Sequence, residues 1–179
     1  RQWHYTEANR NSIDMMLAVN GIPVVAIELK NQLTGQSVDD AMRQWEYNRN
    51  PKEYAFGFNK RVLAYFACDL YNVYMTTQLN GAETVFLPFN QGSNGAGKDG
   101  GAGNPTTEDG KYVTSYFWEN VLQKDKLLDI LQKFISYERS EKKKIMPDGS
   151  TKTTVSSKVI FPRYHQLDVV RELVSHVRE

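Results

Sequence analysis

The chain has little of what small stapled or metal-bound proteins depend on. Its 179 residues include one cysteine, Cys68, and three histidines, so no intrachain disulfide can form and no zinc site with paired ligands is predicted. No apolar run approaches the roughly 18 residues that cross a bilayer, and no signal peptide is recognisable. We therefore expect a cytoplasmic protein without a membrane partner.

A strong excess of positive charge is also missing. Lys and Arg number 22 against 21 Asp and Glu, and the net charge is +1, whereas proteins that coat nucleic acid by charge alone are much more basic. The excess is local, because residues 137–158 carry six basic and three acidic side chains. If DNA is the ligand, it must be held locally or by partners.

The first half of the chain predicts a hairpin followed by a helix. Asn20-Gly21 separates two apolar runs, residues 13–19 and 22–30, and this is the strongest short-range hairpin signal. Ser37, with Asp40 three residues later, predicts the cap of a helix that runs to about residue 49, before Pro51.

The rest of the chain indicates an α/β fold with a mixed central sheet flanked by helices. Further strands are expected over four segments rich in aromatic and β-branched residues: residues 54–58, 62–68, 71–77 and 84–89. Apolar residues at three- and four-residue steps predict a helix over residues 115–135, broken near Lys124. This gives a globular unit over residues 1–136, a mobile charged linker or a long hairpin over 137–158, and a helical segment over 159–179.

Two acidic residues and a lysine are placed where they could meet. Asp14 begins the first strand of the predicted hairpin, and Glu28 and Lys30 share one face at the end of the second. A tight two-residue turn would put Asp14 and Glu28 on opposite faces. One extra residue, as in a three-residue loop with a bulge, would pair them instead.

In that second register the two carboxylates could hold one hard cation, Mg²⁺ or Mn²⁺. The metal would lower the pKa of a bound water and neutralise charge on a phosphodiester, while the Lys30 ammonium would orient the water or stabilise the developing anion. Gln44, in the following helix, can point back toward the carboxylates. A surface salt bridge at a sheet edge is the alternative interpretation of the same residues.

These residues resemble a known family. Asp14, residues 20–23 (Asn-Gly-Ile-Pro), residues 27–31 (Ile-Glu-Leu-Lys-Asn) and Gln44 are similar to the PD-(D/E)xK nuclease domain of the restriction (R) subunit of type I restriction-modification enzymes. Three downstream motifs resemble the same family: Phe-Leu-Pro-Phe at 86–89, Tyr-Phe-Trp-Glu at 116–119 and Phe-Pro-Arg-Tyr-His-Gln-Leu-Asp at 161–168.

The resemblance implies a restriction-endonuclease-like fold and a type I site-specific deoxyribonuclease. It implies Mg²⁺-dependent cleavage of double-stranded DNA, coupled in the full subunit to ATP-driven translocation, in a complex with methyltransferase and specificity subunits. Asp14 and Glu28 would be the metal ligands, Lys30 the catalytic lysine and Gln44 the glutamine of a Gln-x-x-x-Tyr motif. That motif is imperfect, because Tyr47 follows Gln44 by three residues and Asn48 occupies the fourth position.

The same resemblance divides the chain by function. Residues 1–136 would be the endonuclease domain and residues 159–179 the start of a helicase-like motor domain. Gln166 would contact the adenine of ATP, with Arg163 or Phe161 covering the ring; an ordinary capped helix is the alternative. We expect the chain to be a fragment that is inactive alone, with the DNA sequence read by another subunit.

A second kind of function stays open. The chain could be a non-catalytic docking or DNA-binding domain of an ATP-driven DNA translocase, in which the carboxylates are structural. A nucleotide-binding loop of its own is not expected. Residues 92–98 approach the phosphate-binding pattern, but Asp99 stands where Ser or Thr is needed and no helix pattern follows, so a flexible glycine-rich loop is predicted.

Overall fold

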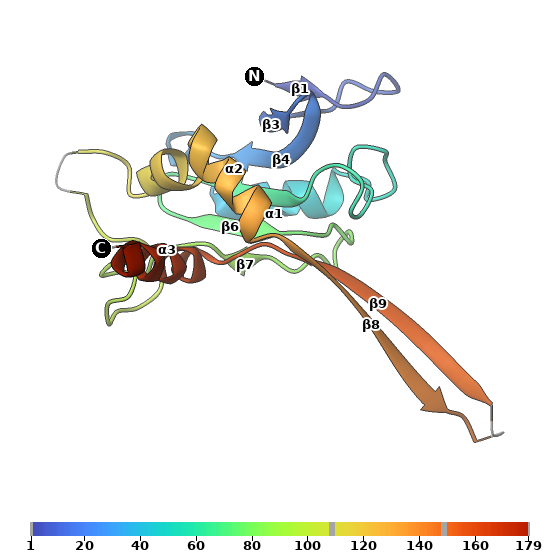
Figure 1. The fold of residues 1–179 in the computed structure, drawn as a ribbon. Helices are drawn as coiled ribbons and strands as arrows, with labels where there is room; N and C mark the ends of the chain where they lie inside the picture. The colour runs from blue at the N-terminus through green and yellow to red at the C-terminus, as the bar shows by residue number, and fades with distance from the viewer. Residues whose placement is uncertain (1, 108–109, 148–149, 179) are drawn as a thin grey trace.

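A five-stranded mixed sheet forms the centre of the molecule (Figure 1). The computed structural model describes residues 2–107, 110–147 and 150–178. The strands lie in the order β3 (Met15–Val19), β4 (Ile22–Leu29), β5 (Ala64–Cys68), β6 (Val73–Thr76) and β7 (Leu87–Pro88). β4 and β5 run parallel, and the other neighbours in this sheet pair antiparallel. The expected α/β fold with a mixed sheet is confirmed.

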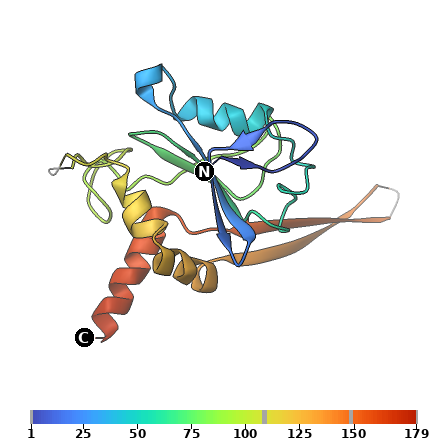
Figure 2. The same ribbon diagram turned by 90° about the horizontal axis from the view of Figure 1, so that it is seen from above.

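Helices cover both faces of this sheet (Figure 2). α1 (Val38–Tyr47) covers one face, while the π-helical turn η2 (Phe117–Val121), α2 (Lys124–Lys133) and α3 (Tyr164–Arg178) lie on the other. Burial on both faces explains why β5 is buried along its whole length, as is usual for strands in a parallel pair.

The α1 face is organised around one aromatic side chain. Trp45 is fully buried, packs edge-on against Tyr65 and Phe56, and donates a hydrogen bond from Nε1 to the carbonyl oxygen of Phe66 at 3.0 Å. The predicted helix start is confirmed, since the Ser37 amide donates to Asp40 Oδ2 at 2.8 Å. These contacts pack α1 against β5.

The opposite face holds a larger aromatic cluster. Phe66 from β5 contacts the rings of Phe89, Phe117 and Phe161 at centroid distances of 5.4, 4.8 and 5.7 Å. Leu167 of α3 is also buried in this cluster. The first residues of the segment predicted to begin a motor domain therefore pack on the sheet of residues 1–136, and the division of the chain into domains stays a prediction.

Several predicted strands differ from those observed. Residues 54–58 form turns instead of a strand, because the Phe56 amide bonds back to the Glu53 carbonyl at 3.0 Å and the Phe56 ring inserts beside Trp45. The predicted strand over 84–89 is reduced to Leu87–Pro88. Aromatic residues in both segments pack in the core without forming strand pairs. Their β propensity therefore predicted strands that do not form.

The first predicted strand is interrupted at Asp14. β2 (Ser12–Ile13) pairs with β1 (Trp3–His4) in a small separate sheet, and β3 begins only at Met15. The break is at the residue that the sequence marks as a candidate metal ligand.

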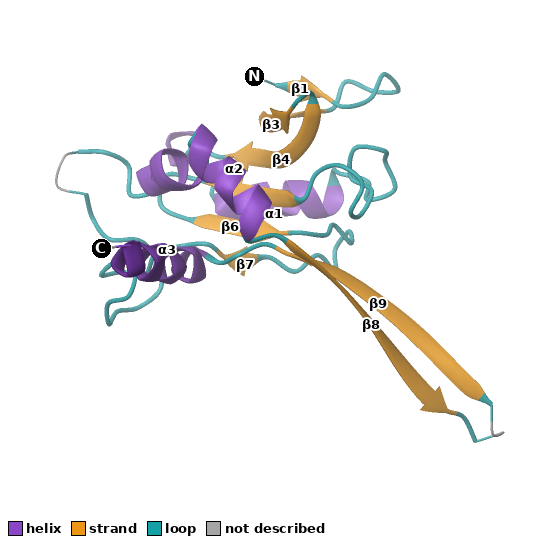
Figure 3. Cartoon of the chain, viewed as in Figure 1, coloured by secondary structure: helices purple, strands orange, loops and turns teal. Residues whose placement is uncertain are grey.

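Residues 115–135 are helical with a break, as predicted. η2 ends at Val121 and α2 begins at Lys124, capped by Gln123, whose side chain accepts a hydrogen bond from the Lys126 amide at 3.1 Å. The charged stretch that follows forms a long two-stranded hairpin, β8 (Ser136–Ile145) and β9 (Thr151–Ile160), coloured as strands in Figure 3.

The glycine-rich loop is closed by its own hydrogen bonds. The Gly92 amide donates to the Gly103 carbonyl at 2.8 Å and the Ser93 amide to the Gly101 carbonyl at 2.9 Å. Among the described residues, the next helical element after the loop is η2, so no helix N-terminus stands behind residues 92–98 as a phosphate site requires. Within the described ranges, the structure also contains no helix with the length and apolarity needed to cross a bilayer.

Candidate active site

A bulge in β4 decides where Asp14 lies. The turn is a tight one, with Asn20 and Gly21 at φ +50° and +80°, and it pairs Val19 with Ile22. Farther along, the register changes between Leu17 and Ala18 because β4 contains one extra residue there. Met15 consequently pairs with Ile27, and continuing this register by one residue brings Asp14 opposite Glu28.

Of the two registers predicted from the sequence, the one that unites the carboxylates is therefore observed. The extra residue lies inside β4 and not in the turn. Asp14 lies at the break between β2 and β3. A hydrogen bond holds its side chain there, because Oδ2 accepts from the Leu29 amide at 2.9 Å.

Glu28 is completely buried and bound to an arginine that the sequence did not single out. Arg49, also buried, donates to Glu28 Oε1 from Nη2 at 2.6 Å and from Nε at 3.0 Å. Its Nη2 also donates to the Ser12 carbonyl at 2.7 Å. Arg49 follows α1 directly, where a basic residue is ordinarily a favourable charge at a helix end, so nothing in the sequence marked it as a partner of Glu28.

The second oxygen of Glu28 is in a different situation from the first. Oε2 is buried and no hydrogen-bond partner for it exists among the described residues. Burial and, to a smaller extent, the Asp14 carboxylate raise the pKa of Glu28, while Arg49 lowers it; the net result is a pKa of about 7. A protonated Glu28 could donate to Asp14, whereas two ionised carboxylates would repel each other.

This donor set fits a divalent cation. Two carboxylates lie side by side, and one of their oxygens is buried without a hydrogen-bond partner in the part of the chain that the structure describes. Hard cations such as Mg²⁺ take oxygen ligands of this kind, and one or two protein carboxylates with several waters are their usual complement. The described residues contain no cluster of three or more Asp, Glu, His or Cys side chains, so water or substrate would supply the remaining ligands.

Lys30 and Gln44 are brought into direct contact. Lys30 Nζ donates to Gln44 Oε1 at 2.5 Å, on the same side of the sheet as Glu28, since α1 packs there. Both line a pocket of about 280 Å³ with Tyr47 and Asn48. Tyr47 lines this pocket with 69 % of its surface exposed to solvent.

Gln166 and Arg163, the residues predicted to contact adenine, do not line this pocket. Gln166 accepts a hydrogen bond from the Arg163 amide at 3.0 Å, the arrangement of a helix cap at the start of α3. Gln166 and Arg163 also line a pocket of about 390 Å³ between β6 and the base of β9. Phe161 is buried between Phe66 and Phe89, which leaves Arg163 as the residue able to lie over an adenine ring.

Comparison with known proteins places the first half of the chain in a described family. Residues 1–92 match the family model described as type I restriction enzyme R protein N terminus, and these residues are more than half of the chain. The chain belongs to this family. Membership in the type I R protein family confirms the resemblance noted in the sequence and agrees with a nuclease-like fold. No curated protein and no solved structure matches the chain.

The family match covers all four residues predicted for the nuclease site, from Asp14 to Gln44, and also Arg49. It ends before the segment that carries Arg163 and Gln166. The family match assigns no roles to individual residues, so the roles of all these residues stay predictions. Cys68 is buried, and burial raises the pKa of its thiol to about 12, which disfavours the thiolate form that a reactive cysteine needs.

Proposed function

We propose that this chain carries the endonuclease site of a type I restriction enzyme R subunit, which hydrolyses phosphodiester bonds of double-stranded DNA with Mg²⁺. The observation that supports it is the pairing of Asp14 with a buried Glu28, on the side of the sheet that also carries Lys30; Glu28 Oε2 has no donor within the described ranges. In the full subunit this cleavage would be coupled to ATP-driven translocation, within a complex with methyltransferase and specificity subunits.

Asp14 and Glu28 would hold the metal, with Mn²⁺ as a substitute. When bound, the cation would supply an activated water and neutralise phosphate charge. Arg49 fixes Glu28 by occupying Oε1 and leaves Oε2 for the cation. Lys30 is kept in one orientation by Gln44 and would place its ammonium against the developing charge on the phosphate.

The decisive experiment uses the complete restriction complex with ATP and Mg²⁺ on plasmid DNA that contains its recognition site. Asp14→Asn and Lys30→Gln should each lower the rate of DNA cleavage by on the order of 10²-fold or more while ATP hydrolysis continues. Asp39→Asn, an exposed carboxylate of α1, is the matched control and should cleave normally. Normal cleavage by Asp14→Asn would show that the assignment is wrong.

One observation favours a second function, a docking domain of a DNA translocase with structural carboxylates. The Arg49–Glu28 pair is buried and could serve the fold alone. The two functions differ in metal binding. Crystals soaked in Mn²⁺ should show anomalous density between Asp14 and Glu28 if the chain is a nuclease, and none if the carboxylates are only structural.

ATP binding near α3 is a separate part of the proposal. Gln166 and Arg163 line one pocket, and their amide and guanidinium groups suit the edge and face of an adenine ring. In the full subunit, Gln166→Ala should raise the KM for ATP without changing metal binding at Asp14 and Glu28. An unchanged KM would leave Gln166 as the helix cap that the structure shows.

A further inference from the structure

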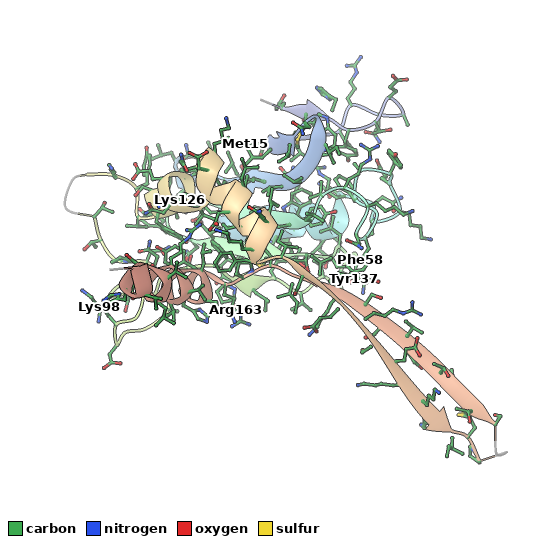
Figure 4. All side chains as sticks on the ribbon, viewed as in Figure 1. Met15, Phe58, Lys98, Lys126, Tyr137 and Arg163 are labelled. Atoms are coloured by element: carbon green, nitrogen blue, oxygen red, sulfur yellow. The ribbon has the colours of Figure 1, made fainter. Side chains whose placement is uncertain are left out.

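The β8–β9 hairpin extends away from the rest of the molecule (Figure 1). Each strand has ten paired residues, which at about 3.4 Å per residue makes the hairpin roughly 30 Å long. Every residue of β8 is exposed. The hairpin is anchored at its base, where Val159 is buried and Thr77 Oγ1 donates to the Val159 carbonyl at 2.8 Å. Figure 4 shows its side chains projecting into open space on both sides.

The register of the hairpin sorts its side chains into two different faces. One face carries three lysines and three small hydroxyl residues along its outer part; we define this lysine face as Ser140, Lys142, Lys144, Lys152, Thr154 and Ser156. The opposite face carries Arg139, paired with Glu141 at 3.2 Å, then Lys143, Val155 and Ile145. The lysine face contains no acidic residue among the described residues beyond the Glu138–Lys158 pair at its base.

The lysine face is unfavourable for the free hairpin. Lys144 lies directly opposite Lys152, and like charges in this position destabilise a strand pair. None of Lys142, Lys144 and Lys152 forms an ion pair with any residue that the structure describes. A two-stranded hairpin without a covering layer is only marginally stable, so a bound anion that neutralised this weak repulsion would stabilise it.

The chemistry of this face favours nucleic acid over protein as that partner. Protein interfaces bury aromatic residues, Met and Arg and are depleted in Lys at their centres, and the lysine face has no aromatic residue. Lys, Ser and Thr side chains are typical contacts to DNA phosphates. The length of the hairpin is close to one helical turn of duplex DNA, about 34 Å.

We propose that the lysine face binds the phosphate backbone of double-stranded DNA without reading its sequence. The hairpin would then be a second DNA contact, separate from the carboxylate site on the α1 side of the sheet. This proposal rests on the proposed function only for the identity of the ligand, double-stranded DNA. The contact itself needs neither the metal nor the residues of the nuclease site.

Fluorescence anisotropy with a labelled duplex of about 30 base pairs tests this contact, with EDTA present so that cleavage and metal binding play no part. The triple variant Lys142→Gln, Lys144→Gln, Lys152→Gln should bind at least about tenfold more weakly near 0.1 M salt. The slope of log affinity against log salt should fall by about two to three, as expected for the loss of three phosphate contacts.

The matched control removes the same charge elsewhere. Lys52, Lys124 and Lys126 are exposed, and the triple Gln variant at these positions should retain most of the affinity and the salt slope. Circular dichroism should show that both triple variants are folded, because all six side chains are exposed. The single variant Lys143→Gln, on the opposite face of β8, should also differ little from the parent chain.

Two results would overturn the proposal: equal weakening by both triple variants, or a parent chain that binds no duplex. In those cases the lysines would serve only to protect exposed strand edges from aggregation. Asp14→Asn should bind DNA normally in EDTA, so failure of the nuclease assignment and failure of the hairpin contact can be told apart.

Discussion

The carboxylate site and the hairpin place charge in opposite environments. Glu28 and Arg49 are buried, and the ion pair between them is short, at 2.6 Å. Lys142, Lys144 and Lys152 are exposed, and their charges meet no partner in the part of the chain that the structure describes. A buried charge requires a fixed partner to avoid a large desolvation cost, whereas exposed charges repel each other weakly and remain available to a mobile polyanion. The first arrangement suits one cation, the second an extended phosphate chain.

Removing the guanidinium should produce the largest effect on stability. Arg49→Met leaves Glu28 buried without its cation, and we expect a loss of about 3–5 kcal/mol in the free energy of unfolding, measured by urea denaturation at pH 8. Arg43→Met, an exposed arginine of α1, is the control. The double variant Arg49→Met, Glu28→Leu should recover much of the loss. If it were as unstable as the single variant, packing of Arg49 and not its charge would be responsible.

The raised pKa of Glu28 predicts the next largest effect. The folded chain binds the Glu28 proton more tightly than the unfolded chain does. The contribution of this proton to the free energy of unfolding is therefore fully present below about pH 4.5 and is lost as the pH rises through 7. From the shift to about 7, the loss is on the order of 3 kcal/mol. Thermal unfolding followed from pH 5 to pH 8 in EDTA should show it, and Glu28→Gln should flatten the curve.

Mg²⁺ should restore stability in the upper part of that pH range. A cation binds the pair of ionised carboxylates only in the folded chain. At a free Mg²⁺ concentration of 100 times its dissociation constant, binding adds about 2.7 kcal/mol to the free energy of unfolding. The increase in Tm should be larger at pH 8 than at pH 6 and absent in Asp14→Asn. A Mg²⁺ effect of the same size in Asp14→Asn would mean that the ion binds elsewhere.

The Lys30–Gln44 contact should contribute less, because both side chains are partly exposed. Gln44→Leu removes the acceptor for the ammonium and should cost about 1 kcal/mol of stability. Its effect on DNA cleavage by the complete complex should be larger than its effect on folding, since Lys30 would lose its fixed orientation. Gln36→Leu, in the same pocket, is the control and should change neither quantity appreciably.

The smallest effect belongs to the hairpin in the absence of DNA. Lys144→Gln relieves the repulsion from Lys152 and should stabilise the hairpin by a few tenths of a kcal/mol. Hydrogen exchange of the β8 and β9 amides can detect such a change, because global unfolding does not report on a locally opening segment. Slower exchange is expected for Lys144→Gln and unchanged exchange for Lys143→Gln.

Local signals in the sequence predicted much of this architecture. Asn20-Gly21 forms the expected turn because both residues adopt positive φ, and Ser37 with Asp40 caps α1 as predicted. The turn chemistry and the cap depend on neighbouring residues only, so they can be read without knowledge of the fold.

Features that depend on distant contacts could not be read in this way. Phe56 lies in a turn because its ring packs beside Trp45, a contact that the local pattern does not encode. The extra residue in β4 has no sequence signature of its own, so the sequence left two registers open. Arg49 was missed for the same reason, since its partner Glu28 is 21 residues away.

The bulge in β4 also limits how the region between the two acids can vary in length. Adding or removing one residue would shift the register by one, so that Asp14 would no longer lie opposite Glu28. Because side chains alternate between faces, the two carboxylates would then lie on opposite sides of the sheet. Adding two residues, one to each strand beyond the bulge, would lengthen the hairpin and keep both acids together. Homologous chains that cut DNA should therefore differ in this segment by even numbers of residues, while odd differences should coincide with loss or relocation of the bulge.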